Sequence, residues 1–275
     1  MSCVSGIILV LNEGKMKKNN KYSITIGWLY PDLMNTYGDR GNIIVLSKRA
    51  EWRGIKVKVL PINIESSQWS IVNCQLLFMG GAQDTQQEIV NRDLLGAKGR
   101  TLVSMIEKGI PGLFICGAYQ FLGKYYITAG GKKLNGLGVF PLFTENPGEG
   151  AKRLIGNVLA EAVGSNTNPQ PPNPNRLLVG FENHGGRTYL SDKNQAFAKV
   201  IKGHGNNGED QTEGIHYKNA IGSYLHGPIL PKNPELTDLL LALAFEEKYG
   251  KKFHLEPLDD SMEQKAREAI IEKIK

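Results

Sequence analysis

The 275-residue sequence predicts an α/β fold with a mostly parallel central sheet covered by helices on both faces. Two observations support this prediction. Short apolar segments bounded by turn residues, which are typical of buried parallel strands, alternate with segments of helical spacing. The connections between them are short, as in βαβ units. A third observation concerns the second half, where strand-like segments separated by Asn/Gly/Pro-rich turns predict added antiparallel strands.

In the first half, ordered structure is expected to begin near Ser23. The apolar segments predicted as strands are residues 24–29, 56–60, 75–79 and 112–115. Apolar residues at helical spacing predict helices over residues 41–53 and 85–108, and each helix ends beside a glycine, Gly54 or Gly109. A further short helix is expected around residues 119–124.

In the second half, strand-like segments are expected at residues 153–160, 177–182, 197–202, 214–217 and 220–225. We expect them to pack on the same sheet rather than to form an independent domain. A helix at 234–249 closes the core, and the Pro/Asn-rich segment 164–176 is expected to be a surface loop. The predicted domain therefore spans residues 23–255, between a disordered leader (1–22) and a charged, helical C-terminal tail (256–275).

Charge and cysteine content exclude several classes of protein. The formal net charge is +6, but half of it lies in residues 1–22, which contain four lysines and one acid. A basic nucleic-acid groove is therefore not indicated. The three cysteines are too few and too scattered for a disulfide framework or a metal site, which favours a reducing, cytoplasmic setting. No apolar run approaches the roughly 20 residues that a membrane span needs.

Cys116 is the candidate nucleophile. A short apolar strand ends directly before it, and Gly117 and Ala118 precede a helical pattern. A side chain on such a turn projects from the carboxyl edge of the sheet, where open α/β folds bind ligands. The positive end of the helix would stabilise a thiolate. The alternative is a buried structural cysteine, which is the usual role of a free cysteine.

A cysteine nucleophile needs a base within hydrogen-bond reach. Among the five histidines, His226 follows a strand-like segment directly and leads His184 only slightly. Gly80 and Gly81 end another predicted strand at the same edge, where a backbone N–H could face an oxyanion or simply form a tight turn. Residues 203–208 match a dinucleotide-binding glycine pattern, but no helix follows them.

Several segments together resemble the class I glutamine amidotransferases, specifically their cobyric acid synthase-like branch. The segments are 113–120 (LFICGAYQ), 80–81 (GG) and 223–228 (SYLHGP). Four longer segments resemble the glutaminase subunits of lipid II isoglutaminyl synthases: 30–41 (YPDLMNTYGDRG), 79–88 (MGGAQDTQQE), 148–157 (GEGAKRLIGN) and 180–188 (GFENHGGRT). The resemblance covers residues 24–250 and implies the flavodoxin-like fold of that class.

The resemblance also implies roles for individual residues. It makes Cys116 the nucleophile and His226 the general acid and base. The N–H groups of Gly81 and Gly117 become the oxyanion donors, and Gln120 and Arg153 become substrate-binding residues. A guanidinium suits the α-carboxylate of glutamine.

One position departs from the wider class, because Pro228 stands where many members have the glutamate that completes a triad. The cobyric acid synthase-like branch shares this loss. The group that orients His226 is therefore open, with Glu182 as an internal candidate and an acid from the partner subunit as the favoured one.

The function implied is hydrolysis of L-glutamine, with delivery of ammonia to a Mur ligase-like partner (MurT) in a heterodimer. The partner would bind ATP and Mg²⁺ and amidate the α-carboxyl of D-glutamate in lipid II. This chain is expected to hold no cofactor or metal. Three alternatives remain: another cobyric acid synthase-like amidotransferase, a different cysteine hydrolase on the same fold, and a non-catalytic scaffold.

Overall fold

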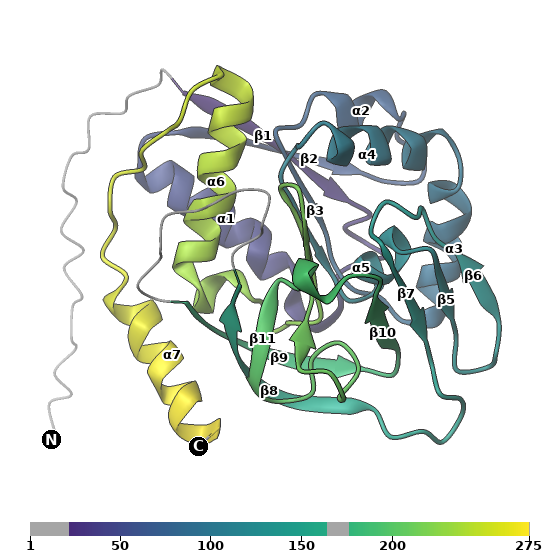
Figure 1. The fold of residues 1–275 in the computed structure, drawn as a ribbon. Coiled ribbons are helices and arrows are strands. Elements are labelled where there is room, and N and C mark those ends of the chain that lie inside the picture. Colours follow the sequence, from purple (N-terminus) through teal and green to yellow (C-terminus); the bar gives the residue numbers. More distant parts are fainter. Residues whose placement is uncertain (1–21, 164–175, 275) are drawn as a thin grey trace, which may run out of the picture.

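A computed structural model describes residues 22–163 and 176–274 (Figure 1). The expected leader, apart from Tyr22, lies outside the described residues. So does the expected loop at 164–176, apart from Arg176.

The central sheet has six strands in the order β13-β14-β4-β3-β1-β2. They are β1 (Ser23–Leu29), β2 (Lys56–Ile62), β3 (Leu76–Met79), β4 (Gly112–Ile115), β13 (Ile215–Tyr217) and β14 (Ala220–Ser223). All neighbouring pairs are parallel except β13 and β14. Every residue of β3 and β4 is buried, which explains why these strands read as unbroken apolar segments.

Helices cover both faces of this sheet (Figure 1). They are α1 (Arg40–Trp52), α2 (Trp69–Val72), α3 (Asp84–Leu94), α4 (Ala97–Glu107), α5 (Gly117–Leu122) and α6 (Pro234–Tyr249). Helix α7 (Ser261–Ile274) packs elsewhere, against the strands at 154–162 and 177–184. Helices α1 and α6 lie together on one face, and α2 to α5 lie on the other. The fold class predicted from the sequence is confirmed.

The prediction of a single long helix over residues 85–108 is wrong, because this segment forms two separate helices, α3 and α4. The chain leaves the helical conformation at Gly96, which has φ −90° and ψ −148°. Close packing follows at Gly99, where a Cβ atom would stand 1.7 Å from the carbonyl oxygen of Leu94. The apolar spacing continues across the break because both helices bury side chains against the same core.

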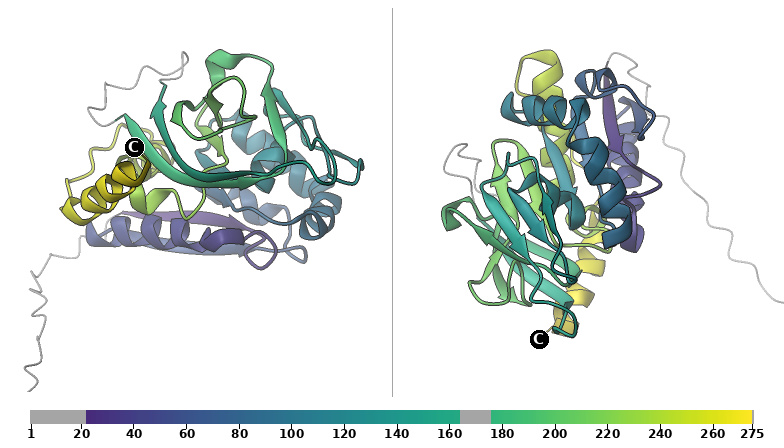
Figure 2. Two further views of the ribbon diagram at one scale, coloured as in Figure 1. Left: turned by 90° about the horizontal axis from the view of Figure 1, so that it is seen from below. Right: turned by 90° about the vertical axis from the view of Figure 1, so that its right-hand side faces the viewer.

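Most of the added strands form two further four-stranded sheets. One has the order β10-β7-β5-β6 and the other β12-β11-β8-β9. Their strands are β5 (Tyr125–Ile127), β6 (Lys133–Asn135), β7 (Leu142–Glu145), β8 (Leu154–Ala162), β9 (Leu177–His184), β10 (Arg187–Leu190), β11 (Ala198–Lys202) and β12 (Thr212–Glu213). Two of the predicted segments instead join the central sheet, β14 as a parallel strand and β13 as an antiparallel strand. Figure 2 shows the long β8 and β9 curving beside the central sheet.

The C-terminal helix α7 has one buried side chain, that of Arg267. The Arg267 guanidinium donates to Glu235 Oε2 at 2.6 Å and to the carbonyl oxygen of Lys232 at 3.1 Å. The helix is thus docked beside the start of α6 rather than free. Within residues 22–163 and 176–274, no helix is long and apolar enough to span a membrane.

Candidate active site

The candidate site lies at the carboxyl edge of four adjacent strands of the central sheet. Asp39 follows β1, Gly81 follows β3, Cys116 follows β4 and His226 follows β14. Because these strands are neighbours and parallel, the segments that leave them converge at one edge. Residues far apart in the sequence therefore meet there.

Cys116 occupies a strained turn between β4 and α5. Its φ of 54° and ψ of −107° lie in a region that non-glycine residues rarely adopt. Its N–H donates to the carbonyl oxygen of Ser223 at 2.8 Å, which fixes the turn against β14. This geometry aims a side chain out of the sheet edge, as in the nucleophile elbows of hydrolases.

His226 is completely buried, and both its backbone and its ring are anchored. An isolated β-bridge to Phe181 on β9 holds the backbone, with hydrogen bonds of 2.7 and 3.2 Å. Nδ1 lies 3.1 Å from Asp39 Oδ1, and a carboxylate there requires the proton on Nδ1. Burial opposes a charge on the ring, but Asp39 and Cys116 outweigh it and raise the pKa of His226 to about 10.

Asp39 is therefore the acid beside the histidine. It is fully buried at the start of α1. The segment that carries it is strained, since Tyr37 has φ 56° and packs its ring edgewise on His226 with 5.0 Å between centroids. In the sequence, the segment 30–41 contributed to the family resemblance, but Asp39 was assigned no role. The only available signal was an acidic residue in a turn-rich loop after the first strand.

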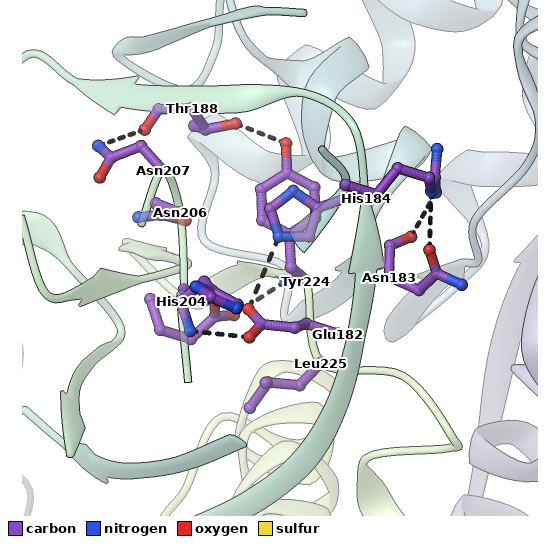
Figure 3. Close-up of polar contacts among 12 residues, drawn as sticks. Glu182, Asn183, His184, Thr188, His204, Asn206, Asn207, Tyr224 and Leu225 are labelled. Atoms are coloured by element: carbon purple, nitrogen blue, oxygen red, sulfur yellow. Dashed lines mark hydrogen bonds and ion pairs between the residues drawn. The ribbon is translucent and has the colours of Figure 1, made fainter. Parts of the chain in front are cut away.

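Glu182 was the internal candidate for this role, and the structure places it elsewhere. Its buried carboxylate accepts hydrogen bonds from the N–H groups of His204 (2.7 Å) and Gly205 (2.8 Å) and lies 3.7 Å from His184 Nε2 (Figure 3). His184, the second candidate base, stacks on Tyr224 with 3.6 Å between ring centroids. Burial lowers the pKa of His184, so its ring is neutral at neutral pH.

Gly81 lies against both the nucleophile and the histidine. A Cβ atom on it would stand 2.8 Å from His226 Cε1 and 3.1 Å from Cys116 Cβ, so only glycine fits. Its N–H donates to Asp39 Oδ2 at 2.8 Å. The expectation that this N–H is free for an oxyanion is therefore wrong for this conformation. Gly117 is the first residue of α5, and its N–H has no intrahelical acceptor.

A cavity of about 500 Å³ opens over Cys116. Gln120 and Arg153, the two predicted substrate-binding residues, both line it. Gln120 is buried, and its Nε2 donates to the Tyr224 hydroxyl at 3.0 Å. Arg153 is exposed at the rim, where Asn183 accepts two hydrogen bonds from its guanidinium, both at 2.9 Å.

Two further buried residues support the site and were missed by sequence reasoning. Tyr224 links Gln120 to Thr188, whose hydroxyl lies 2.6 Å from the tyrosine oxygen (Figure 3). Glu213 on β12 accepts hydrogen bonds from Ser223 Oγ and the N–H of Tyr224, and burial raises its pKa to about 7. These contacts hold the chain between β14 and His226. Tyr224 lies in the segment 223–228 that carries the family resemblance, but the sequence assigned no role to it or to Glu213.

Comparison with known proteins identifies clear relatives. Residues 25–234 match the CobB/CobQ-like glutamine amidotransferase domain family. The subunit GatD of the glutamine-hydrolysing lipid II isoglutaminyl synthase of Staphylococcus aureus (strain N315) is 44% identical over 252 residues, which are 92% of this chain and 96% of the relative. The Streptococcus pneumoniae (strain ATCC BAA-255 / R6) GatD subunit is 38% identical over 91% of each chain.

Solved structures of low sequence identity share the fold. A glutamine amidotransferase crystal structure aligns with a TM-score of 0.53 at 16% identity, covering 80% of this chain and 98% of the other. The glutaminase domain of Trypanosoma brucei CTPS aligns with a TM-score of 0.53 at 12% identity, covering 85% and 96%. At these identities the likeness concerns the fold alone.

Proposed function

The chain belongs to the CobB/CobQ-like glutamine amidotransferases, and within them to the GatD subunits of lipid II isoglutaminyl synthase, and we propose that it hydrolyses L-glutamine through a Cys116 thioester. The observation that carries this proposal is the buried Asp39–His226 pair beside a strained cysteine at the floor of a cavity. A histidine with a pKa of about 10 is protonated at neutral pH and can therefore act as the general acid in the first half of the reaction.

In the first half of the reaction, the Cys116 thiolate attacks the carboxamide carbon of glutamine. A carbon–sulfur bond forms and the carbonyl oxygen becomes an oxyanion. We assign its stabilisation to the N–H of Gly117 and to that of Ala82, whose nitrogen lies 3.3 Å from where a Gly117 Cβ would stand. One well-placed donor contributes about 3–4 kcal/mol. His226 Nε2 then gives its proton to the departing nitrogen, and ammonia leaves as the carbon–nitrogen bond breaks.

In the second half, His226 acts as a base. Forming the thioester removes the negative charge on sulfur, which is one of the interactions that raise the pKa of His226. The neutral ring accepts a proton from water while the water oxygen attacks the thioester carbon. The carbon–sulfur bond breaks, glutamate is released, and the thiolate–imidazolium pair is restored.

Substrate binding is proposed to use the two cavity residues named above. Asn183 holds the Arg153 guanidinium at the rim, where it can pair with the α-carboxylate of glutamine. The Gln120 side chain forms part of the wall beside Cys116, the position of the scissile amide.

The ammonia is proposed to pass to a Mur ligase-like partner subunit (MurT) in a cytoplasmic heterodimer. The partner would use ATP and Mg²⁺ to activate the α-carboxyl of D-glutamate in lipid II, and ammonia would convert it to D-isoglutamine. The names of the two relatives support lipid II as the acceptor and the presence of a further subunit. The Mur ligase-like character of that subunit follows from the family resemblance alone. In this division of labour, the chain itself needs no cofactor.

The test separates the two halves of this proposal. Cys116→Ala should abolish glutamate release and glutamine-dependent amidation by the complex, while added ammonium chloride restores amidation. Cys74→Ala is the matched control, because Cys74 is also a buried free cysteine but does not line the cavity. Failure of ammonium to rescue an assembled Cys116→Ala complex would contradict the division of labour. Glutamate release by Cys116→Ala would contradict the nucleophile.

A further inference from the structure

Tyr37 contacts the candidate catalytic histidine and also lines the cavity. Its ring centroid lies 5.0 Å from that of His226, and the two ring planes stand at 75° to each other. Aromatic rings prefer such an edge-to-face arrangement, which stabilises their contact. His226 itself is completely buried and does not line the cavity, whereas Tyr37 and Cys116 do. The Tyr37 side chain therefore borders both the histidine and the cavity.

Folding alone does not explain why a tyrosine occupies position 37. Its φ of 56° and ψ of 27° fall in the left-handed region, which is strained for a residue other than glycine. The residue is 45% exposed, so much of its apolar surface stays in water. The next residue, Gly38, is also left-handed, with φ 79°. Strain of this kind is typical of functional sites, where surrounding contacts hold it in place.

The contacts that hold this turn come from the candidate site. The N–H of Thr36 donates to the carbonyl oxygen of Gly81 at 3.1 Å. Asp39 follows shortly after and contacts both His226 Nδ1 (3.1 Å) and the N–H of Gly81 (2.8 Å). The residues on either side of Tyr37 are thus tied to the groups that surround the histidine.

The imidazole of His226 needs a restraint of this kind. The hydrogen bond from Nδ1 to Asp39 holds one atom of the ring. In the proposed reaction Nε2 must also point at the reacting atoms, where a displacement of about 1 Å can cost a hundredfold in rate. Packing supplies further restraint, because Gly81 lies against Cε1 and the Tyr37 ring lies against the imidazole.

We propose that Tyr37 is a positioning residue, whose ring holds the His226 imidazole in the orientation that directs Nε2 to the reaction at Cys116. This inference rests on the proposed glutaminase function. It assigns the role to the aromatic ring and not to the hydroxyl group, because the contact with His226 is between the two rings. Phenylalanine at this position would keep the contact, and alanine would remove it.

The test measures glutamate release by the full chain at a temperature at which circular dichroism shows every variant to be folded. Tyr37→Ala should lower kcat about tenfold, equivalent to ~1.4 kcal/mol, and change KM by less than about twofold. Tyr37→Phe should keep kcat within about twofold of the unmodified chain, since it retains the ring. Tyr217→Ala is the matched control, because it removes another edge-to-face contact, with Phe140 at 6.2 Å, outside the cavity lining.

A second measurement needs no turnover. The Nδ1 proton of His226 is buried and hydrogen-bonded to Asp39, so it is protected from exchange with water. Proton NMR of protein labelled at histidine should show faster exchange of this proton in Tyr37→Ala than in Tyr37→Phe or Tyr217→Ala.

Three results would overturn the inference. One is an unchanged kcat in Tyr37→Ala. Another is a higher KM with the same kcat, which would make Tyr37 a substrate contact. The third is an equal loss of kcat in Tyr37→Ala and Tyr37→Phe, which would assign the effect to the hydroxyl group. If the unmodified chain releases no glutamate, alone or with its partner subunit, the proposed function fails, and the exchange measurement still decides whether Tyr37 holds His226.

Discussion

At the residue scale, the two oxygens of Asp39 hold different groups. Oδ1 contacts His226 Nδ1 and Oδ2 accepts the N–H of Gly81. One carboxylate thus sets the orientation and charge of the histidine and also the position of the glycine beside the nucleophile. Because both contacts are buried, water screens neither of them.

Asp39→Asn should move the pH profile of glutamate release. The Asp39 charge favours protonated His226, so its removal lowers the histidine pKa from about 10 and shifts the basic limb of kcat/KM to lower pH. At neutral pH the rate should fall by about two to four orders of magnitude, since the ring also loses its oriented tautomer. Steady-state kinetics across pH 6–10 measure both effects.

Asp32→Asn is the control for this prediction, because Asp32 is exposed in the same loop. If Asp39→Asn and Asp32→Asn release glutamate at the same rate and with the same pH profile, Asp39 does not set the pKa or the tautomer of His226. An acid supplied by the partner subunit would then be the group to seek.

At the element scale, a buried arginine joins three helical segments. Arg49 on α1 is 2% exposed and donates to both oxygens of Asp238 on α6, each at 2.8 Å. It also pairs with Asp260, directly before α7. Burial opposes the charge on Asp238, but Arg49 and Arg53 hold its pKa below the usual value. The helices on the α1 face are therefore joined by charge as well as by apolar contact.

Arg49→Ala should lower the free energy of unfolding by about 1–3 kcal/mol, because it removes charged hydrogen bonds to Asp238 and Asp260, although Asp238 keeps its contact with Arg53. Urea unfolding followed by circular dichroism measures the loss. Lys48→Ala is the matched control, since the Lys48–Glu51 pair is exposed on the same helix and contributes about 0–1 kcal/mol. Equal midpoints for the two variants would contradict a role for Arg49 in joining the helices.

At the scale of the whole molecule, the candidate site is assembled within one chain. Four strands of the central sheet supply Asp39, Gly81, Cys116 and His226, and β9 of another sheet anchors the backbone of His226 through Phe181. The sequence left the orienting acid open and favoured one from the partner. Its internal candidate was Glu182, whereas in the structure the carboxylate of this chain that contacts His226 is Asp39.

We therefore expect the isolated chain to hydrolyse glutamine at a rate of the same order of magnitude as the assembled complex. Glutamate release at saturating glutamine, measured with and without the Mur ligase-like partner, tests this expectation. A rise of several orders of magnitude on assembly would restore the partner-supplied acid, or another step that assembly completes, as the controlling feature.

Those parts of the fold and of the site that depend on residues close together in the sequence could be predicted from the sequence. Strands β1, β3 and β4 read as apolar segments because they lie inside a parallel sheet that is covered on both faces, and α6 spans the predicted range. Cys116 was found for a similar reason, since a strand, a tight turn and a helix are contiguous in the chain. Resemblance to a known family then selected His226 among the five histidines.

Other features depend on contacts that no local pattern encodes. The break at Gly96 leaves the apolar spacing intact, and the strands of the second half alternate in the same way whichever sheet they join. The sequence by itself determined the elements and the nucleophile, because hydrophobic periodicity and turn chemistry act over a few residues. Only the tertiary structure decided that Asp39, 187 residues from His226, is the acid beside it and that Gly81 donates to that acid, because the packing of whole strands and helices selects such pairs.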